Sequence, residues 1–139
     1  LECVRLLLDA SAVVVVDQAY NNGATPLRIA CQQGHLECAK LLLGAGAAVD
    51  QATEYGVTPL YIACEKDHVD VLRLLLEADA AVNQAKENGF TPLSIACEMG
   101  HLEIARLLLE AGAAVGQARN NGVTPLLMAC QEGHLECAR

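Results

Sequence analysis

The fold of the chain is decided by one stretch, residues 23–43, which reads GATPLRIACQQGHLECAKLLL. Three further stretches with the same pattern begin at residues 56, 89 and 122. The four prolines stand at positions 26, 59, 92 and 125, and the four histidines at 35, 68, 101 and 134, so both series advance by 33 residues. A fixed period of this length is the sequence signature of a solenoid, in which structural repeats stack on one another.

The first half of the stretch predicts a short helix. Thr25 is a good N-cap, because its hydroxyl can accept a hydrogen bond from an unpaired backbone N–H. Pro26 suits the first helical position, where a missing N–H does no harm. Gly34 indicates the end of the helix, since Gly readily adopts the left-handed conformation of a C-terminal cap. The face that we expect to be buried holds apolar residues three and four apart, namely Leu27, Ala30 and Cys31.

The second half of the stretch predicts another helix, from about His35 to Leu43. Its inward face should hold four apolar side chains, namely Leu36, Ala39, Leu42 and Leu43. On the outer face, an acid and a base three residues apart should form an ion pair. This spacing occurs at Glu37/Lys40, Asp70/Arg73, Glu103/Arg106 and Glu136/Arg139. Between the copies, the dipeptides Asn22-Gly23 and Asn88-Gly89 favour a tight hairpin turn.

The period of 33 residues, the Thr-Pro-Leu-x-x-Ala run and the Gly-His-Leu-Glu segment before Leu-Leu-Leu resemble ankyrin repeats. The resemblance covers essentially the whole chain. Tetratricopeptide repeats differ in having a 34-residue period and no Thr-Pro-Leu cap. The resemblance implies an all-α ankyrin-repeat solenoid of stacked helix-turn-helix pairs with short β-hairpin fingers. We divide this single solenoid, residues 1–139, into a partial repeat at 1–16, full repeats at 17–49, 50–82 and 83–115, and a truncated repeat at 116–139.

The chain departs from the family pattern at several positions. The family usually has His after Thr-Pro-Leu, and the residues found there are Arg28, Tyr61, Ser94 and Leu127. Asp67 stands at the turn where the other copies have Gly. At the turn after the second helix, Asp79 and Ser11 stand where the other copies have Gly. Asp tolerates a left-handed backbone better than Ser, so we expect an altered turn at Ser11 and a local bulge over residues 12–17. Polar-faced cap repeats are also missing, so either the end units expose apolar surface or the natural protein continues beyond both ends.

Composition excludes several classes of function. Lys and Arg total 9 and Asp and Glu total 17, which gives a formal net charge of −8. An excess of acid argues against nucleic-acid binding, which relies on basic residues that neutralise phosphates, and against docking on anionic lipid. No apolar run reaches the roughly 18 residues of a membrane span, so we expect no membrane insertion.

The seven cysteines raise the alternatives of a disulfide or a metal site. Cys31, Cys64, Cys97 and Cys130 form a column, one per repeat, on the face that we expect to be buried. Packed helices lie roughly 10 Å apart, which is too far for a disulfide within this column. A zinc site could use the Cys-x3-His-x2-Cys pattern found at Cys31/His35/Cys38 and Cys130/His134/Cys137. Val and Ile replace the third residue in the other copies, which favours an apolar core position. We expect reduced cysteines, no metal, and an intracellular location, cytoplasmic or nuclear.

No pattern in the chain indicates an enzyme. The four histidines recur at one structural position without a nucleophile and an orienting acid beside each of them. We expect each of them to satisfy backbone groups of a loop. The glycines are typical of turns rather than of a phosphate-binding loop, so neither a cofactor nor a small-molecule ligand is expected.

Positions that vary between repeats but share a face are free to specify a partner. All three tyrosines and the only phenylalanine fall at such positions, and we expect them to be exposed anchors on the groove that the resemblance implies. The chain is then a monomeric, non-enzymatic protein–protein interaction scaffold. The alternatives are a passive spacer, or a regulatory or targeting arm of a larger enzyme or channel. The predicted partner-binding residues are Tyr20, Asn22, Arg28, Glu54, Tyr55, Val57, Tyr61, Glu65, Glu87, Phe90, Ser94, Glu98, Met99, Asn121 and Leu127.

Overall fold

The computed structural model describes residues 2–10 and 16–138. This part of the chain forms nine helices and contains no strand. The helices are α1 (Glu2–Ala10), α2 (Pro26–Gln33), α3 (Leu36–Gly44), α4 (Pro59–Glu65), α5 (Val69–Glu77), α6 (Pro92–Met99), α7 (Leu102–Glu110), α8 (Pro125–Gln131) and α9 (Leu135–Ala138). The all-α repeat solenoid that the sequence predicts is confirmed. None of the helices in the described residues is both long and apolar enough to cross a membrane.

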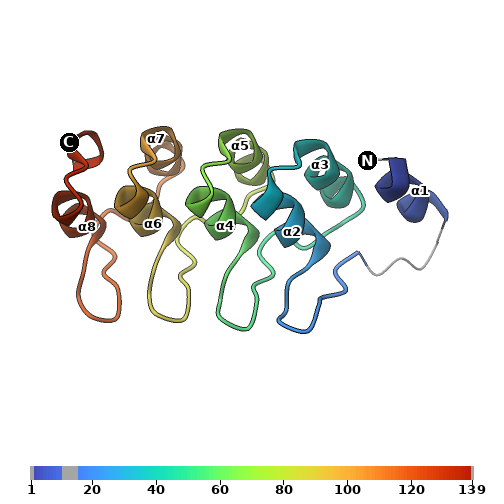
Figure 1. Ribbon diagram of the computed structural model, residues 1–139, viewed down its shortest axis with the longest axis horizontal. Helices are drawn as coiled ribbons and strands as arrows, with labels where there is room; N and C mark the ends of the chain where they lie inside the picture. The colour runs from blue at the N-terminus through green and yellow to red at the C-terminus, as the bar shows by residue number, and fades with distance from the viewer. Residues whose placement is uncertain (1, 11–15, 139) are drawn as a thin grey trace.

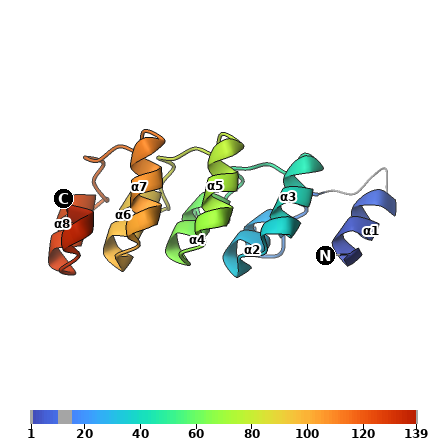
Figure 2. The same cartoon turned by 90° about the horizontal axis from the view of Figure 1, so that it is seen from above.

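The helices form two parallel rows (Figures 1 and 2). The first helices are α2, α4, α6 and α8. Each packs against its own second helix, and neighbouring first helices pack against each other in the pairs α2–α4, α4–α6 and α6–α8. The second helices are α3, α5, α7 and α9, and α1 packs against α3 as α3 packs against α5. The fingers, which are the loops at residues 18–24, 51–57, 84–90 and 117–123, all project from the side of the first helices (Figure 1). One surface thus combines the fingers with the first helices.

The caps of the first helices form as the sequence predicts. Each starts with Pro, and the Thr before it accepts a hydrogen bond from the N–H three residues later, at 3.2 Å in the case of Thr25 and Arg28. Gly34 ends α2 with a φ of 73°, and Asp67 and Asp79 take the same left-handed conformation with φ of 59° and 60°. The predictions for Ser11 and for the bulge at 12–17 fall mostly on residues 11–15, which lie outside the described residues.

The core runs between the two rows of helices. The side chains of Leu27 and Ala39 are fully buried, whereas Leu36 and Leu43 are half-buried. Cys31 and Cys64 are fully buried as well. Burial raises the pKa of the Cys31 thiol to about 12 and that of Cys64 higher still, so both thiols stay protonated and unreactive at neutral pH.

The expected burial of the whole cysteine column is wrong at its last member. Cys130 is exposed, because in the described part of the chain no further first helix packs against α8 on this face. Cys97, one repeat earlier, is only 4% exposed, since α8 packs against α6.

The outer ion pairs agree with the prediction only in part. Lys40 Nζ lies 3.1 Å from Glu37 Oε1, as the spacing predicts. Arg73 instead reaches Glu103 of the next repeat, at 3.3 Å. Neighbouring second helices lie side by side, so a long guanidinium can contact a carboxylate across the gap as easily as along its own helix. The fourth predicted pair includes residue 139, which lies outside the described residues.

The fingers are tight turns rather than β-hairpins, which corrects that detail of the prediction. Two backbone hydrogen bonds close each finger. In the second finger the N–H of Thr53 donates to the carbonyl of Val57 at 3.0 Å, and the N–H of Gly56 donates to the carbonyl of Thr53 at 2.9 Å. One further bond joins neighbouring fingers, such as that from the N–H of Glu87 to the carbonyl of Tyr55, also at 3.0 Å. These arms are too short to build a ladder, so no strand forms in the described residues.

Three of the four histidines bind backbone groups, as expected, but they do so across the boundary between repeats. His68 Nε2 lies 3.0 Å from the carbonyl oxygen of Gln32, and His134 Nε2 lies 2.9 Å from that of Glu98. His101 uses Nδ1, which lies 2.9 Å from the carbonyl oxygen of Cys64. Because a carbonyl only accepts, each ring nitrogen must donate. Each ring therefore satisfies the end of the preceding first helix and ties two repeats together.

Candidate partner-binding surface

The structure divides the predicted partner-binding residues by exposure. The exposed residues are Tyr20, Asn22, Glu54, Tyr55, Glu87, Met99, Asn121 and Leu127. Four residues are half-buried, namely Arg28, Val57, Glu65 and Glu98. Three are buried, namely Tyr61, Phe90 and Ser94, which are 3%, 9% and 1% exposed. The prediction that Tyr61 and Phe90 are exposed anchors is therefore wrong.

Basic side chains from neighbouring fingers cover the two buried aromatic rings. Lys86 Nζ lies 5.3 Å from the centroid of the Tyr61 ring. Arg119 Cζ lies 3.6 Å from the centroid of the Phe90 ring. Both distances are in the range of a cation–π interaction. In each pair the basic residue belongs to the repeat after that of the aromatic residue. No pattern within one repeat therefore predicts the contact.

At the position where the family usually has His, the side chain makes different contacts in each repeat. Arg28 Nη1 donates to Gln32 Oε1 at 2.6 Å. Tyr61 is packed into the core. Ser94 completes a capping box, in which its Oγ accepts from the N–H of Thr91 at 2.8 Å. Leu127 is 52% exposed. Of the four, Leu127 offers the most side-chain surface to a partner.

The surface carries negative charge around Tyr61. Burial raises the pKa of the Tyr61 hydroxyl, and the charges of Glu65 and Glu98 raise it further, whereas Arg119 lowers it. Glu65 and Glu98, which come from successive first helices, therefore both act on the Tyr61 hydroxyl. Glu54 and Glu87 add exposed carboxylates on successive fingers. Lys86 and Arg119, whose cationic groups lie over the Tyr61 and Phe90 rings, contribute positive charge to the same surface.

Exposed aromatic surface remains at two fingers. Tyr20 is 74% exposed and Tyr55 is 59% exposed. Tyr55 lines a hollow of about 340 Å³ with Lys86, Glu87 and Asn88 of the next finger. A tyrosine beside a hollow offers both apolar area and a hydroxyl at small cost in conformational entropy. Tyr20 lines a hollow as well, of about 420 Å³, so both exposed tyrosines are candidate anchors.

The first set of possible zinc ligands does not converge in the structure, and the second set includes Cys137, whose side chain lies outside the described part. Among the side chains that the structure describes, no group of three His, Cys, Asp or Glu lies close enough to hold a metal ion. Cys31 is buried in the core, while His35 is exposed and Cys38 is half-buried.

Comparison with known families agrees with the architecture. A family model described as ankyrin repeats in three copies matches residues 1–86, 45–118 and 79–139, which together cover the chain. No curated protein matches the sequence. Repeats of this kind are generally protein–protein interaction modules. On the helix pairs, the caps and this match, the chain belongs to the ankyrin repeat family.

Proposed function

We propose that the chain is a non-enzymatic scaffold that binds a partner protein through its fingers and the exposed side of its first helices. The observation that carries this proposal is the exposure of large apolar side chains at positions that vary between repeats. They are Tyr20, Tyr55, Met99 and Leu127. Exposed aromatic and apolar side chains with a polar surround are typical of interface anchors.

The charge of the surface favours a partner with a basic or neutral rim. Glu54 and Glu87 are exposed on the two middle fingers, and Glu65 and Glu98 lie on the two middle first helices. Complementary charge mainly accelerates association and selects the partner, while buried anchors supply most of the affinity. Tyr61 and Phe90, as buried residues, support the surface from beneath.

A comparative capture experiment tests the proposal. Immobilised wild-type chain, a Tyr20→Ala/Tyr55→Ala variant and an Arg106→Ala control should be exposed to the same protein mixture. Arg106 is exposed on α7 in the row of second helices, away from the fingers. We expect proteins that are retained by the wild type and the control but not by the double variant. Isothermal titration with one such purified protein should then show at least a tenfold loss of affinity for the variant.

Two other outcomes would contradict the proposal. Equal retention by all three chains would favour the passive spacer, which has no use for this surface. Loss of binding with Arg106→Ala alone would place the interface on the second helices. A regulatory or targeting arm of an enzyme or channel is compatible with a positive result, because such an arm also acts by binding.

A further inference from the structure

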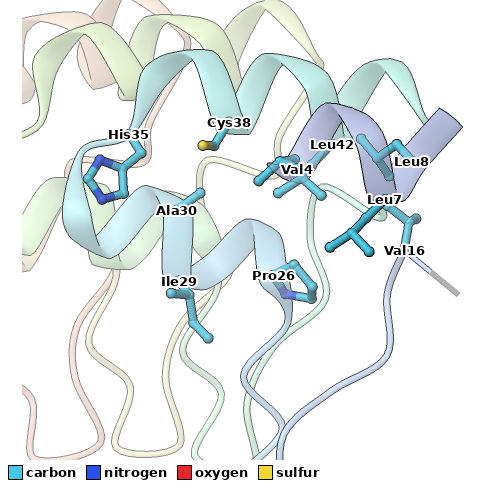
Figure 3. Close-up of a pocket in the computed structure, with 10 residues that line it drawn as sticks. All are labelled: Val4, Leu7, Leu8, Val16, Pro26, Ile29, Ala30, His35, Cys38 and Leu42. Carbon is cyan, nitrogen blue, oxygen red and sulfur yellow. The ribbon is translucent and has the colours of Figure 1, made fainter. Parts of the chain in front are cut away.

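Three of the four fingers carry the dipeptide Asn-Gly at the same position, as Asn22-Gly23, Asn88-Gly89 and Asn121-Gly122. In the remaining finger the dipeptide is Tyr55-Gly56. Asparagine before glycine is the pair in which a backbone nitrogen most easily reaches a side-chain amide, because glycine has no Cβ to obstruct the approach. Reactive groups therefore meet in the fingers. In the hollow between α1 and the α2–α3 pair, by contrast, all the lining residues except His35 and Cys38 are apolar (Figure 3).

The reaction open to this pair needs only water. The backbone nitrogen of the glycine attacks Cγ of the asparagine, and the bond from Cγ to Nδ2 breaks. The proton of the glycine nitrogen leaves with Nδ2 as ammonia, and a five-membered cyclic imide remains. Water then adds to one of the two imide carbonyls, and the bond from that carbon to the nitrogen breaks. Hydrolysis at the side-chain carbonyl gives aspartate, and hydrolysis at the main-chain carbonyl gives isoaspartate, in which the backbone runs through the side chain.

Hydrogen bonds of the closed finger oppose this reaction at Asn88. The N–H of Gly89 donates to the carbonyl of Lys86 at 2.9 Å, so its hydrogen is not available to water. Asn88 Oδ1 accepts from the N–H of Phe90 at 3.1 Å. The imide nitrogen carries no hydrogen, so the bond from Gly89 to Lys86 must break before the ring forms. The two equivalent bonds exist at Asn22, at 2.8 Å and 3.0 Å.

The following finger helps to hold the third finger, residues 84–90, in its closed form. The N–H of Asn120 donates to the carbonyl of Asn88 at 3.3 Å, and Asn120 Nδ2 donates to the carbonyl of Glu87 at 3.1 Å. These two carbonyls belong to the peptide groups on either side of the Asn88 side chain. The amide therefore reacts only in molecules whose finger has opened locally. Because the chemical step is slow, its rate follows the fraction of open molecules.

The architecture requires the glycine of this pair but not the asparagine. Gly89 has a φ of 86°, and a Cβ there would lie 2.7 Å from the backbone nitrogen of Asn120. The second finger has Tyr55 in place of the asparagine. Its Thr53 hydroxyl accepts from the N–H of Val57 at 3.2 Å, which replaces the bond that the asparagine makes in the other fingers. A finger therefore forms without the reactive amide, so the amide of the third finger is not a requirement of the fold.

We propose that Asn88 is a site of spontaneous modification, at which opening of the third finger lets the Gly89 nitrogen convert the side-chain amide to aspartate and isoaspartate. The new carboxylate stands in the hollow that Asn88 lines with Tyr55, Lys86 and Glu87. It adds negative charge beside a candidate anchor, so the surface of the fingers changes with the age of the molecule. The modification does not depend on the proposed function, whereas its effect on a partner rests on that function.

Incubation of the wild-type chain at pH 8, with and without guanidinium chloride, tests the proposal. Peptide mass spectrometry should find both aspartate and isoaspartate at Asn88 in the two samples. Conversion should be ten to a hundred times slower in the native chain, because only the open fraction reacts. Asn21 and Asn83 are the internal controls, since the residues that follow them are Asn and Gln. Both should convert at least tenfold more slowly than Asn88 in the denatured chain.

Asn120→Ala tests the control by the neighbouring finger. The variant loses the side-chain bond to the Glu87 carbonyl, so the native rate at Asn88 should rise at least threefold, while the native rate at Asn22 stays unchanged. Asn120 is exposed, so circular dichroism should show intact helices.

Several results would overturn the proposal. Equal rates in the native and denatured chains, or no change with Asn120→Ala, would show that the finger does not control the reaction. A native rate below one hundredth of the denatured rate would show that the finger opens too rarely. Aspartate as the sole product would mean direct hydrolysis of the amide rather than attack by the Gly89 nitrogen. Conversion of Asn21 as fast as that of Asn88 would remove the role of the glycine.

Discussion

Phe90 shows at the scale of one residue how a neighbouring repeat changes the role of a side chain. The ring is 9% exposed and lies under the guanidinium of Arg119. We expect Phe90→Ala to lower the free energy of unfolding by about 3 kcal/mol, since it leaves a cavity and removes a stacked cation. Urea denaturation monitored by circular dichroism measures this change. Tyr55→Ala is the matched control, and it should change stability by no more than about 0.5 kcal/mol.

The buried thiols give a second prediction at this scale. Cys31 and Cys64 should react with an alkylating reagent only after unfolding, whereas Cys3 and Cys130, which are exposed, should react in the native state. Mass spectrometry of peptides after a timed reaction at pH 8 reads this out. Rapid native labelling of Cys31 would show that the first helices open locally.

The raised thiol pKa also sets the sign of a pH dependence. The pKa of Cys31 rises from an ordinary value of 9.0 to about 12 on folding. Between these values the folded chain keeps a proton that the unfolded chain has lost, so stability falls as the pH rises through this window. Cys31→Ala should show a smaller loss of stability between pH 9 and pH 11 than the wild type, measured by denaturant midpoint at each pH. An identical loss in both chains would remove Cys31 as the cause.

At the scale of the elements, the turn between α2 and α3 depends on a glycine for two reasons. Gly34 has a φ of 73°, and a Cβ there would lie 2.7 Å from Cε1 of His68 in the next repeat. Gly34→Ala therefore adds a steric clash to the backbone strain. Gly46→Ala is the control, because Gly46 has a φ of 91° but open space around it.

We expect Gly46→Ala to cost about 1 kcal/mol of stability from the left-handed backbone alone. Gly34→Ala should cost clearly more, because the His68 ring must also move away from the Gln32 carbonyl. Thermal unfolding of the two variants gives the comparison. Equal losses of stability in the two variants would mean that the His68 ring moves aside at no cost in free energy.

The elements themselves follow from local sequence, but the role of several side chains does not. Thr25, Pro26 and Gly34 act within one helix, so their spacing is enough to predict the caps. The burial of Tyr61 depends on Lys86, and the pairing of Arg73 depends on Glu103. Those contacts join different repeats, and their geometry is set by the stacking distance and by side-chain rotamers. A repeat pattern read from sequence contains neither quantity, which is why the candidate surface was predicted less well than the fold.

At the scale of the whole molecule, stability should be highest in the middle of the stack. Each inner repeat packs against two neighbours, whereas α1 packs against α3 alone among the second helices, and Leu6 and Leu7 remain 65% and 67% exposed. Stability in such stacks is close to a sum of repeat and interface contributions. Amide hydrogen exchange should therefore be slowest in α4 to α7 and fastest in residues 2–10, in residues 16–20 and after about residue 125. Uniform protection along the chain would contradict this picture.

The histidine bridges mean that a repeat is not a self-contained module. Gly34 and Gly100 leave room for the next histidine ring, which then binds through Nε2, whereas Asp67 precedes a junction at which His101 binds through Nδ1 to a carbonyl one position earlier in its repeat. The residue after one first helix and the histidine ring before the second helix of the following repeat thus specify each other. The two members of each pair stand in successive repeats. If repeats were shuffled, duplicated or deleted, every cut would therefore bring together a turn residue and a histidine ring from different junctions, and the new pair would have to be compatible for the stack to form.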